Sequence, residues 1–338
     1  MNGKQPAVYC WASRMEEELS KPILLWLQRH GWESPQRVLG GRNNQIYRVV
    51  GSPGTAALKV YFHGPADSRK RWAAEKAFYS HAAACEASAP QWLAGEEGLN
   101  VSLLTWIEGE PLQSPIRPED VAWAGSFLQA INKNASPTIL PESLASEACF
   151  SVQEHILLLE QRIKRMEEAS DRSSALALFM ANQLAPFAKK VFENLKKQPK
   201  AEFKKHNFRR IYSPGDFGFH NALRGKSGRI AFFDFEYAGW DDPAKTVADI
   251  FLQPEKPVAA ELLPFFLKNM PEWGGLEERV RIWIPFFAAK WAVILLSGAV
   301  PTTDQRRKFA GELPSEEKLH RQIDKAAAVL ARSGDFSI

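Results

Sequence analysis

The segment Ile211–Asp234 constrains the fold of this chain most, because it combines polar residues at fixed spacing with a short β-hairpin pattern. Two short apolar runs flank the turn Arg224–Gly228, which favours a tight reversal of the chain. Asp216 and Asn221 precede the first run, and Asp234 directly follows the second. Antiparallel pairing of the two runs would bring these three side chains to the open end of one hairpin.

Two carboxylates and an amide at one place are the groups that phosphoryl transfer from ATP requires. One carboxylate orients the acceptor hydroxyl and takes its proton, while the other oxygens bind Mg²⁺ on the phosphates. Asp216 fits the first role, and Asn221 and Asp234 fit the second. Any one of the three alone is better explained as a turn residue or a strand-end cap. Their combination favours the catalytic interpretation.

The first third of the chain predicts an antiparallel meander followed by one helix. Three runs rich in β-branched and aromatic residues are separated by turn residues, and they cover Arg37–Gly41, Ile46–Val50 and Ala56–Phe62. The capping segment Gly64–Ser68 then precedes a helix that we expect over Arg69–Ala84, which contains no glycine or proline.

A boundary between two lobes is expected near residue 108. Leu99–Ile107 predicts a further strand, and turn residues follow it. Helical periodicity dominates from Pro118 onward, including Gln153–Ala169 and Ser174–Lys197. We therefore expect an α+β fold in which residues 1–108 form a small sheet with one helix and residues 109–338 form a mainly helical lobe that carries the hairpin.

Lys59 and Glu75 are expected to form a buried ion pair. Lys59 lies in the middle of the apolar third run, and Glu75 lies on the apolar stripe of the following helix, between Trp72 and Phe78. A buried charge needs a partner, and the other donors of the lysine could then bind the α- and β-phosphates of ATP. In the alternative, Lys59 snorkels out to solvent and Glu75 lies at the edge of its stripe.

These motifs resemble those of the aminoglycoside phosphotransferase and choline kinase superfamily, whose fold is that of the protein kinases with a modified C-terminal lobe. The similarity runs from about Val38 to Asp249. It is most specific in the Asp216-x-x-x-x-Asn221 loop, which resembles the catalytic loop of the family, and in the segment Ile230–Glu236, which resembles its magnesium-binding Asp-x-Glu or Asp-x-Asp segment. The resemblance implies a protein-kinase-like fold and an ATP- and Mg²⁺-dependent kinase that phosphorylates a hydroxyl group of a small molecule.

The same resemblance implies a role for each matching residue. Asp216 is then the catalytic aspartate, Asn221 and Asp234 hold Mg²⁺, and Lys59, paired with Glu75, contacts the ATP phosphates. The turn that contains Gly40, Gly41 and Asn43 would cover the phosphates of ATP. The hinge that contains Thr105, Trp106 and Ile107 would bind adenine through its backbone. The glycine pattern of the turn is weak support by itself.

The chain departs from the family pattern in two places. Pro214 stands where the family usually has a histidine before Gly-Asp, so the contribution of that histidine must come from elsewhere. The stretch Trp240–Pro243 resembles the Asp-Pro stretch of the family, and Asp249 is expected to brace the catalytic loop, although the spacing is longer than usual. His220, beside Asn221, is expected to serve packing or hydrogen bonding rather than catalysis.

Composition excludes several classes of protein. The 43 lysines and arginines against 39 acids give a mild net charge of +4 without a long basic run, so we expect no nucleic-acid partner. The three cysteines are far apart and include no CxxC pair, as in a cytoplasmic protein with reduced thiols. The N-terminal residues lack the layout of a signal peptide. Because Lys290 and Pro285 interrupt the apolar stretch Ile282–Val300, we expect a buried helix there and no membrane span.

Alternative functions and acceptors can be compared on the same residues. Few residues separate Asp234 from the helix expected near Pro243, which leaves no room for the activation loop of a protein kinase. A pseudokinase acting as a scaffold or sensor would usually lack one of the catalytic residues that are present here. Glu236, Asp241 and Asp242 could line an acidic cleft for a polycationic aminoglycoside, or they could be a cap and a solvated turn. A sugar, an amino alcohol or a lipid-linked glycan is equally compatible as the acceptor.

Overall fold

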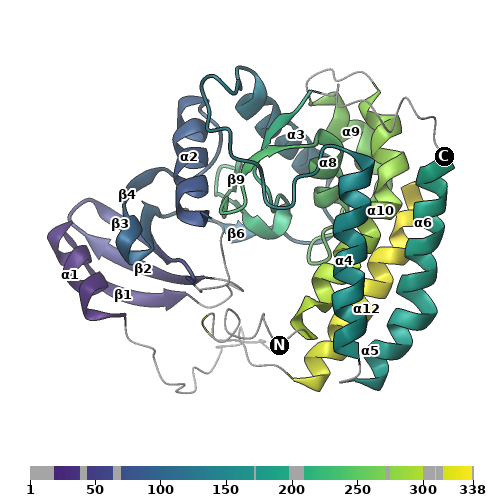
Figure 1. Cartoon of the computed structure of the whole chain (residues 1–338). Helices are drawn as coiled ribbons and strands as arrows, with labels where there is room; N and C mark the ends of the chain where they lie inside the picture. The colour runs from purple at the N-terminus through teal and green to yellow at the C-terminus, as the bar shows by residue number, and fades with distance from the viewer. Residues whose placement is uncertain are drawn as a thin grey trace, which may run out of the picture.

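The computed structural model describes residues 19–38, 44–63, 70–170, 173–197, 209–270, 275–299, 309 and 315–336. A small sheet with one helix on its outer side lies at one end of the molecule, and a larger, mostly helical body lies at the other (Figure 1). Helix α2 stands between them. The α+β architecture expected from the sequence is therefore confirmed.

The sheet is antiparallel, with strand order β1-β2-β3-β5-β4. Its strands are β1 (Trp32–Val38), β2 (Gln45–Gly51), β3 (Gly54–Val60), β4 (Trp92–Glu96) and β5 (Val101–Thr105). The expected meander is confirmed, but β1 begins five residues before the expected Arg37. The register of β1 shifts between Glu33 and Gln36, around Ser34 and its left-handed φ of 53°, so residues typical of a turn here form an irregularity within a strand.

Two elements of this part were not predicted. Helix α1 (Lys21–Arg29) buries Ile23, Trp26 and Leu27 in the same apolar cluster as Val49 and Leu58 of the sheet. Strand β4 extends the sheet beyond β5, and the turn η1 (Glu97–Leu99) joins the two strands. The strand expected over Leu99–Ile107 is correspondingly shorter.

Helix α2 (Arg71–Ala84) connects the sheet to the helical body through its buried face. Phe78 packs against Tyr212 and Phe235, with ring centroids 5.4 and 4.3 Å apart. Tyr79 contacts Phe235 at 5.0 Å. The helix that presents Glu75 is therefore fixed by aromatic packing against the segments that carry the hairpin residues.

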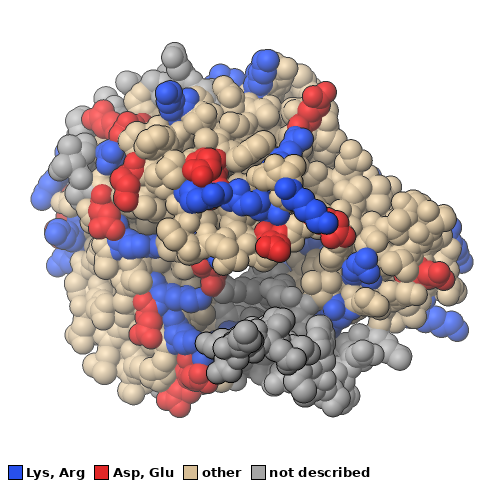
Figure 2. Space-filling view, turned by 180° about the vertical axis from the view of Figure 1, so that it is seen from behind, with Lys and Arg blue, Asp and Glu red and all other residues tan. Residues whose placement is uncertain are grey.

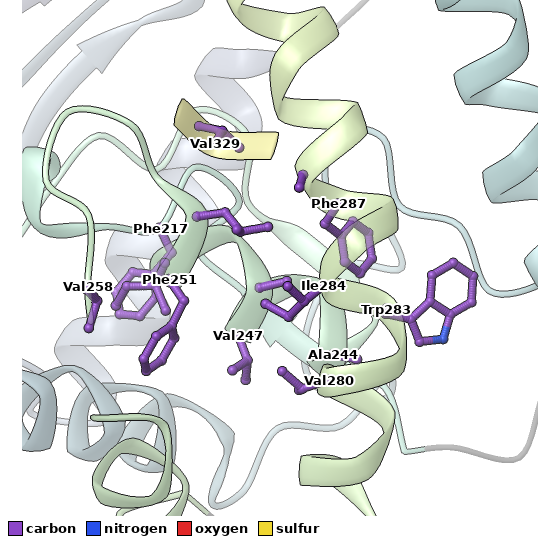
Figure 3. Packing of buried hydrophobic residues seen from close by; sticks show 14 of the residues in the cluster. Phe217, Ala244, Val247, Phe251, Val258, Val280, Trp283, Ile284, Phe287 and Val329 are labelled. Atoms are coloured by element: carbon purple, nitrogen blue, oxygen red, sulfur yellow. The ribbon is translucent and has the colours of Figure 1, made fainter. Parts of the chain in front are cut away.

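The helical body is built around one broad apolar core. Its helices are α3 (Pro118–Asn132), α4 (Val152–Ser170), α5 (Ser174–Phe179), α6 (Ala185–Lys197), α8 (Pro243–Leu252), α9 (Leu263–Lys268), α10 (Leu276–Leu296) and α12 (Glu316–Arg332). Short turns complete it, namely η2 (Met180–Leu184), η3 (Phe219–Asn221), η4 (Ala260–Leu262), η5 (Ser297–Ala299) and η7 (Ser333–Phe336). Figure 3 shows Val247 and Phe251 of α8, Ile284 of α10 and Val329 of α12 in one apolar cluster with Phe217 of the loop that carries Asp216.

Two helix predictions for this body can be compared with the structure. The apolar stretch that begins at Ile282 lies in α10, which buries Lys290 together with its apolar neighbours, as expected. Within the part of the chain that the structure describes, no helix is long and apolar enough to cross a membrane. The helix expected over Ser174–Lys197 is interrupted by the π-turn η2, because Pro186 lacks the N–H that would bond to residue 182.

The predicted hairpin is confirmed. Strand β8 (Ala222–Arg224) pairs with β9 (Ile230–Phe232), with Ala222 opposite Phe232, and β6 (Glu110–Pro111) adds an edge strand. A second antiparallel pair joins β7 (Ile211–Ser213), which precedes the loop of Asp216, to β10 (Gly239–Asp241), which follows the hairpin. This pair was not predicted, because its strands are short and far apart in the sequence.

Candidate active site

Lys59 and Glu75 form the predicted buried ion pair. The ammonium Nζ lies 2.9 and 2.7 Å from the two carboxylate oxygens, and the residues are 3% and 0% exposed. Burial lowers the pKa of Lys59, but Asp234 and Glu75 outweigh it and hold the pKa well above its ordinary value. Tyr61 donates a further hydrogen bond to Glu75 at 2.5 Å. The snorkelling alternative is thus wrong.

Asp234 joins this pair from the hairpin. Its Oδ1 lies 2.5 Å from Nζ of Lys59, although the residues are 175 positions apart in the sequence. The backbone N–H groups of Asp234 and Phe235 donate to the hydroxyl of Tyr79 at 3.3 Å and to Glu75 at 3.0 Å. These bonds from α2 hold Asp234 in a left-handed conformation with a φ of 67°.

The environment of Asp234 favours a cation. Its side chain keeps 35% of its surface exposed, so an ion could reach it. Partial burial, with Glu236 and Glu75 nearby, raises the pKa of Asp234 to about 6 against the opposing effect of Lys59. A divalent cation would relieve the repulsion among these acids.

Asp216 lies on the loop between β7 and the hairpin, with 36% of its side chain exposed. The amide nitrogen of Asn221 donates to the backbone oxygen of Asp216 at 3.1 Å. The backbone oxygen of Asn221 in turn accepts a hydrogen bond from the backbone N–H of Phe233 at 3.0 Å. The loop is therefore attached to the strand that leads into Asp234. His220 places Nε2 3.4 Å from Oδ2 of Asp216, so the ring that we expected to pack or bond does contact the candidate catalytic carboxylate.

Gly215 allows this loop to form, because it has a left-handed φ of 85° and packs closely on Tyr237. A Cβ at residue 215 would lie 2.5 Å from the backbone carbon and oxygen of Tyr237. We expect Gly215→Ala to lower the free energy of unfolding by about 2 kcal/mol or more, from left-handed strain plus the clash. Denaturant unfolding measures this loss.

Gly228 in the hairpin turn provides the matched control. Its φ is 81°, but a Cβ there would meet no atom within 4 Å. Gly228→Ala should therefore lose only the strain contribution, about 1 kcal/mol. Equal losses in the two variants would show that the contact of Gly215 with Tyr237 is not tight.

The brace of the catalytic loop differs from the expected one. Asp249 does not reach this loop, since its carboxylate binds Lys245 at 2.9 Å and Trp291 at 3.0 Å, so its prediction as the brace was wrong. Instead, the hydroxyl groups of Ser213 and Thr246 lie 2.9 Å apart, and Ser213 accepts from the backbone N–H of Gly215 at 3.2 Å. Helix α8 still supports the loop, but through a threonine one turn earlier.

The acids considered for a cationic acceptor are buried and paired within the protein. Asp241 binds Lys245 at 2.7 Å. Asp242 caps α8 through the N–H of Ala244 and pairs with Arg279, which agrees with the alternative of a cap. Burial raises the pKa of Asp242 to about 7 against the effect of Arg279. The acidic-cleft hypothesis is therefore wrong for both aspartates.

Glu236 is also withdrawn from solvent, with 2% of its surface exposed. Asn44 donates to its Oε2 at 2.7 Å, and Arg71 places Nη1 3.8 Å from its Oε1. Burial raises the pKa of Glu236, but Lys59, Arg71 and Asn44 outweigh it and lower the pKa below its ordinary value. Asn44 and Arg71 thus hold the Glu236 carboxylate between the sheet and α2, and it is not part of an open acidic cleft.

The predicted nucleotide-binding segments are only partly described. Thr105 ends β5, and its hydroxyl accepts from the backbone N–H of Gln91 at 2.9 Å. Trp106 and Ile107 follow β5 outside any helix or strand, in the connection that leads toward the helical body. The turn residues Gly40, Gly41 and Asn43 lie outside the described residues.

The donor set fits Mg²⁺ bound together with phosphates. The hydrogen bond to Asp216 uses the amide nitrogen of Asn221, which leaves its amide oxygen as the atom that could bind a cation. Over the described ranges, no group of three or more His, Cys, Asp or Glu side chains could hold a metal ion by itself. Mg²⁺ commonly binds through one or two protein oxygens and the substrate phosphates, so Asn221 and Asp234 suit this mode.

Comparison with protein families gives a match over most of the chain. The model of the phosphotransferase enzyme family matches residues 34–279. This range includes the ion pair of Lys59, the loop of Asp216 and the hairpin. Among the curated proteins that were compared, none matches the sequence.

Solved structures show the same fold. Choline kinase LicA from Streptococcus pneumoniae is similar with a TM-score of 0.61 at 17% identity, covering 92% of this chain and 98% of that one. A spectinomycin phosphotransferase in complex with ADP and spectinomycin has a TM-score of 0.60 at 10% identity, covering 93% and 99%. An aminoglycoside phosphotransferase in complex with gentamicin has a TM-score of 0.61 at 14% identity, covering 95% and 99%.

Proposed function

Because the chain belongs to the phosphotransferase enzyme family, we propose that it is a small-molecule kinase that transfers the γ-phosphate of ATP, bound with Mg²⁺, to a hydroxyl group. The observation that carries this proposal is the meeting of Lys59, Glu75 and Asp234 within 2.5–2.9 Å. A cation for the phosphates and a carboxylate for a metal ion thus lie side by side between the sheet and the hairpin.

In the proposed reaction, each residue acts on a separate part of the substrates. Lys59, held by Glu75, binds the α- and β-phosphates, and Asn221 and Asp234 would hold Mg²⁺, which neutralises charge on the phosphates when it is bound. Asp216 orients the acceptor hydroxyl and takes its proton as the acceptor oxygen bonds to the γ-phosphorus. The bond from the γ-phosphorus to the β–γ bridging oxygen breaks, and ADP leaves.

The hinge and the two lobes complete this proposal. We assign adenine binding to the backbone of Thr105, Trp106 and Ile107, and phosphate cover to the turn with Gly40, Gly41 and Asn43. Residues 1–108 would form the nucleotide-binding lobe, and residues 109–338 would supply the catalytic loop and the acceptor site. Lys59, Asp216, Asn221 and Asp234 are all present, which argues against a pseudokinase.

The acceptor is proposed at the level of its class, a small hydroxylated molecule. The structures that resemble this chain include a choline kinase and phosphotransferases bound to spectinomycin and gentamicin, so amino alcohols, sugars and aminoglycosides are the compounds to screen. A polycation receives no support from Glu236, Asp241 or Asp242, because each is buried and already forms an ion pair with a cationic side chain. Basic and acidic side chains are interspersed on the face shown in Figure 2.

Thermal unfolding with nucleotides tests the proposal. We expect ATP with Mg²⁺ to raise the Tm of the purified protein and ATP without Mg²⁺ to raise it less, with GTP as the comparison nucleotide. Ligand at 100 times its Kd stabilises the folded state by about 2.7 kcal/mol, a shift that thermal unfolding resolves. Asp324→Asn, on an exposed position of α12, should behave as the wild type. An unchanged Tm with both nucleotides would favour a scaffold instead.

A further inference from the structure

Glu236 is the second acid of the Asp-x-Glu segment, and its surroundings differ sharply from those of Asp234, the first. Asp234 keeps 35% of its side chain exposed, whereas the side chain of Glu236 is 0% exposed. Its Oε2 accepts from Asn44 at 2.7 Å, and its Oε1 faces Arg71 at 3.8 Å. A metal ion bound to Glu236 would have to displace these partners, so the carboxylate is placed to hold protein groups.

Asn44 uses both ends of its amide in this contact. While Nδ2 donates to Glu236, Oδ1 accepts from the backbone N–H of Phe62 at 3.3 Å. Phe62 follows β3, the strand that carries Lys59, and Asn44 itself leads directly into β2. The amide therefore links the adjoining ends of β2 and β3, beside Lys59, to the segment that carries Asp234.

Arg71 adds the third attachment. It is the first residue of α2, it is 3% exposed, and its guanidinium lies 5.5 Å from the ring centroid of Tyr237. Glu236 thus contacts the start of β2 through Asn44 and the start of α2 through Arg71. It lies two residues after Asp234, so a displacement of Glu236 would be transmitted to the metal-binding position.

We propose that Glu236 is a positioning residue that, through Asn44 and Arg71, fixes the adjoining ends of β2 and β3, beside Lys59, against the Asp234 segment and does not bind the metal ion itself. This inference rests on the proposed function, because it assumes that nucleotide and Mg²⁺ bind at Lys59 and Asp234. It predicts that the hydrogen bond between residues 44 and 236 matters for nucleotide affinity, whichever of the two side chains carries the negative charge.

An exchange of the two side chains tests this proposal. Asn44→Asp alone places two carboxylates face to face, and Glu236→Gln alone removes the charge that faces Arg71. In the double variant Asn44→Asp/Glu236→Gln, the amide of residue 236 can donate to the carboxylate of residue 44, so the hydrogen bond returns with reversed polarity and the net charge of the cluster is unchanged. The wild type, both single variants and the double variant are compared by calorimetric titration with ATP at saturating Mg²⁺, and by titration of Mg²⁺ at fixed ATP.

We expect each single variant to weaken ATP binding about tenfold or more, the scale of one hydrogen bond to a charged group. The double variant should recover most of that loss with a Mg²⁺ requirement like that of the wild type. Trp72→Phe is the matched control, because it removes another hydrogen bond between α2 and the sheet, 2.8 Å from Nε1 to the oxygen of Val101. Its ATP affinity should equal that of the wild type, and Tm values without nucleotide report the purely structural cost of every variant.

Each other outcome contradicts a specific part of the inference. If the double variant remains weak and needs more Mg²⁺, Glu236 is a metal ligand and the proposal is overturned. If the single variants bind ATP as the wild type does, the contact has no positioning role. If the wild type itself binds neither ATP nor GTP, the proposed function fails and this inference fails with it.

Discussion

Asp216→Asn should lower kcat by about 10²–10⁴-fold while nucleotide affinity stays near that of the wild type. The substitution keeps the shape of the side chain but removes the base that takes the proton of the acceptor hydroxyl. The loop should keep its conformation, because Asn221 bonds to the backbone oxygen of Asp216 rather than to its carboxylate. Release of ADP in the presence of choline, spectinomycin, gentamicin or simple sugars measures kcat, using whichever compound gives the fastest turnover with the wild type.

Asp324→Asn is the control for this experiment, because it removes one carboxylate from an exposed position of α12. Its kcat should match that of the wild type. Near-normal turnover of the Asp216 variant would remove Asp216 from the catalytic role. Loss of ATP binding in that variant, measured by calorimetry, would show instead that the aspartate supports the nucleotide site.

The candidate site could be predicted from sequence where the pattern was local. The spacing of Asp216, Asn221 and Asp234 around a recognisable turn was enough to place them at one hairpin. The pair of Lys59 and Glu75 could also be predicted, because a charge in an apolar strand and a charge on an apolar helical stripe each need a partner. Each pattern indicates one buried charge of opposite sign, so an ion pair between the two residues follows.

Predictions failed where a contact depends on residues far away in the sequence. The choice for Asp242 between lining a cleft and capping a helix stayed open, because the sequence does not show that Arg279, on another helix, faces it. The contact of Asn44 with Glu236 spans 192 positions and has no local pattern that announces it. Asp249 was assigned to the brace from a spacing already longer than usual, and Thr246 supports the loop instead.

For a buried acid, such distant contacts determine whether its pKa is raised or lowered. Asp234 and Glu236 are two residues apart, yet the pKa of Asp234 is raised and that of Glu236 is lowered. Burial raises both values and Lys59 lowers both. Arg71 and a hydrogen bond from Asn44 lower the pKa of Glu236 further, whereas Glu236 and Glu75 raise that of Asp234. The two carboxylates of one motif are thereby suited to different tasks, one to a cation and one to the protein.

Asp234→Asn should abolish the Mg²⁺-dependent part of nucleotide binding and lower kcat by several orders of magnitude. An amide in place of the carboxylate loses the negative charge that would hold the ion on the phosphates. The variant should still fold, because Lys59 keeps its partner Glu75 at 2.7 Å and the change relieves repulsion among the neighbouring acids. Calorimetric titration of ATP with and without Mg²⁺ measures the effect.

Glu255→Gln is the matched control, since it also removes the acidic partner of a lysine, at 2.6 Å from Lys325, but outside the candidate site. Its titrations with and without Mg²⁺ should match those of the wild type. If Asp234→Asn retains the full difference between the two titrations, the ion is held elsewhere, and the assignment of Asn221 and Asp234 is wrong. If Asp234→Asn loses all ATP binding, with or without Mg²⁺, the carboxylate acts mainly by positioning Lys59, which it contacts at 2.5 Å.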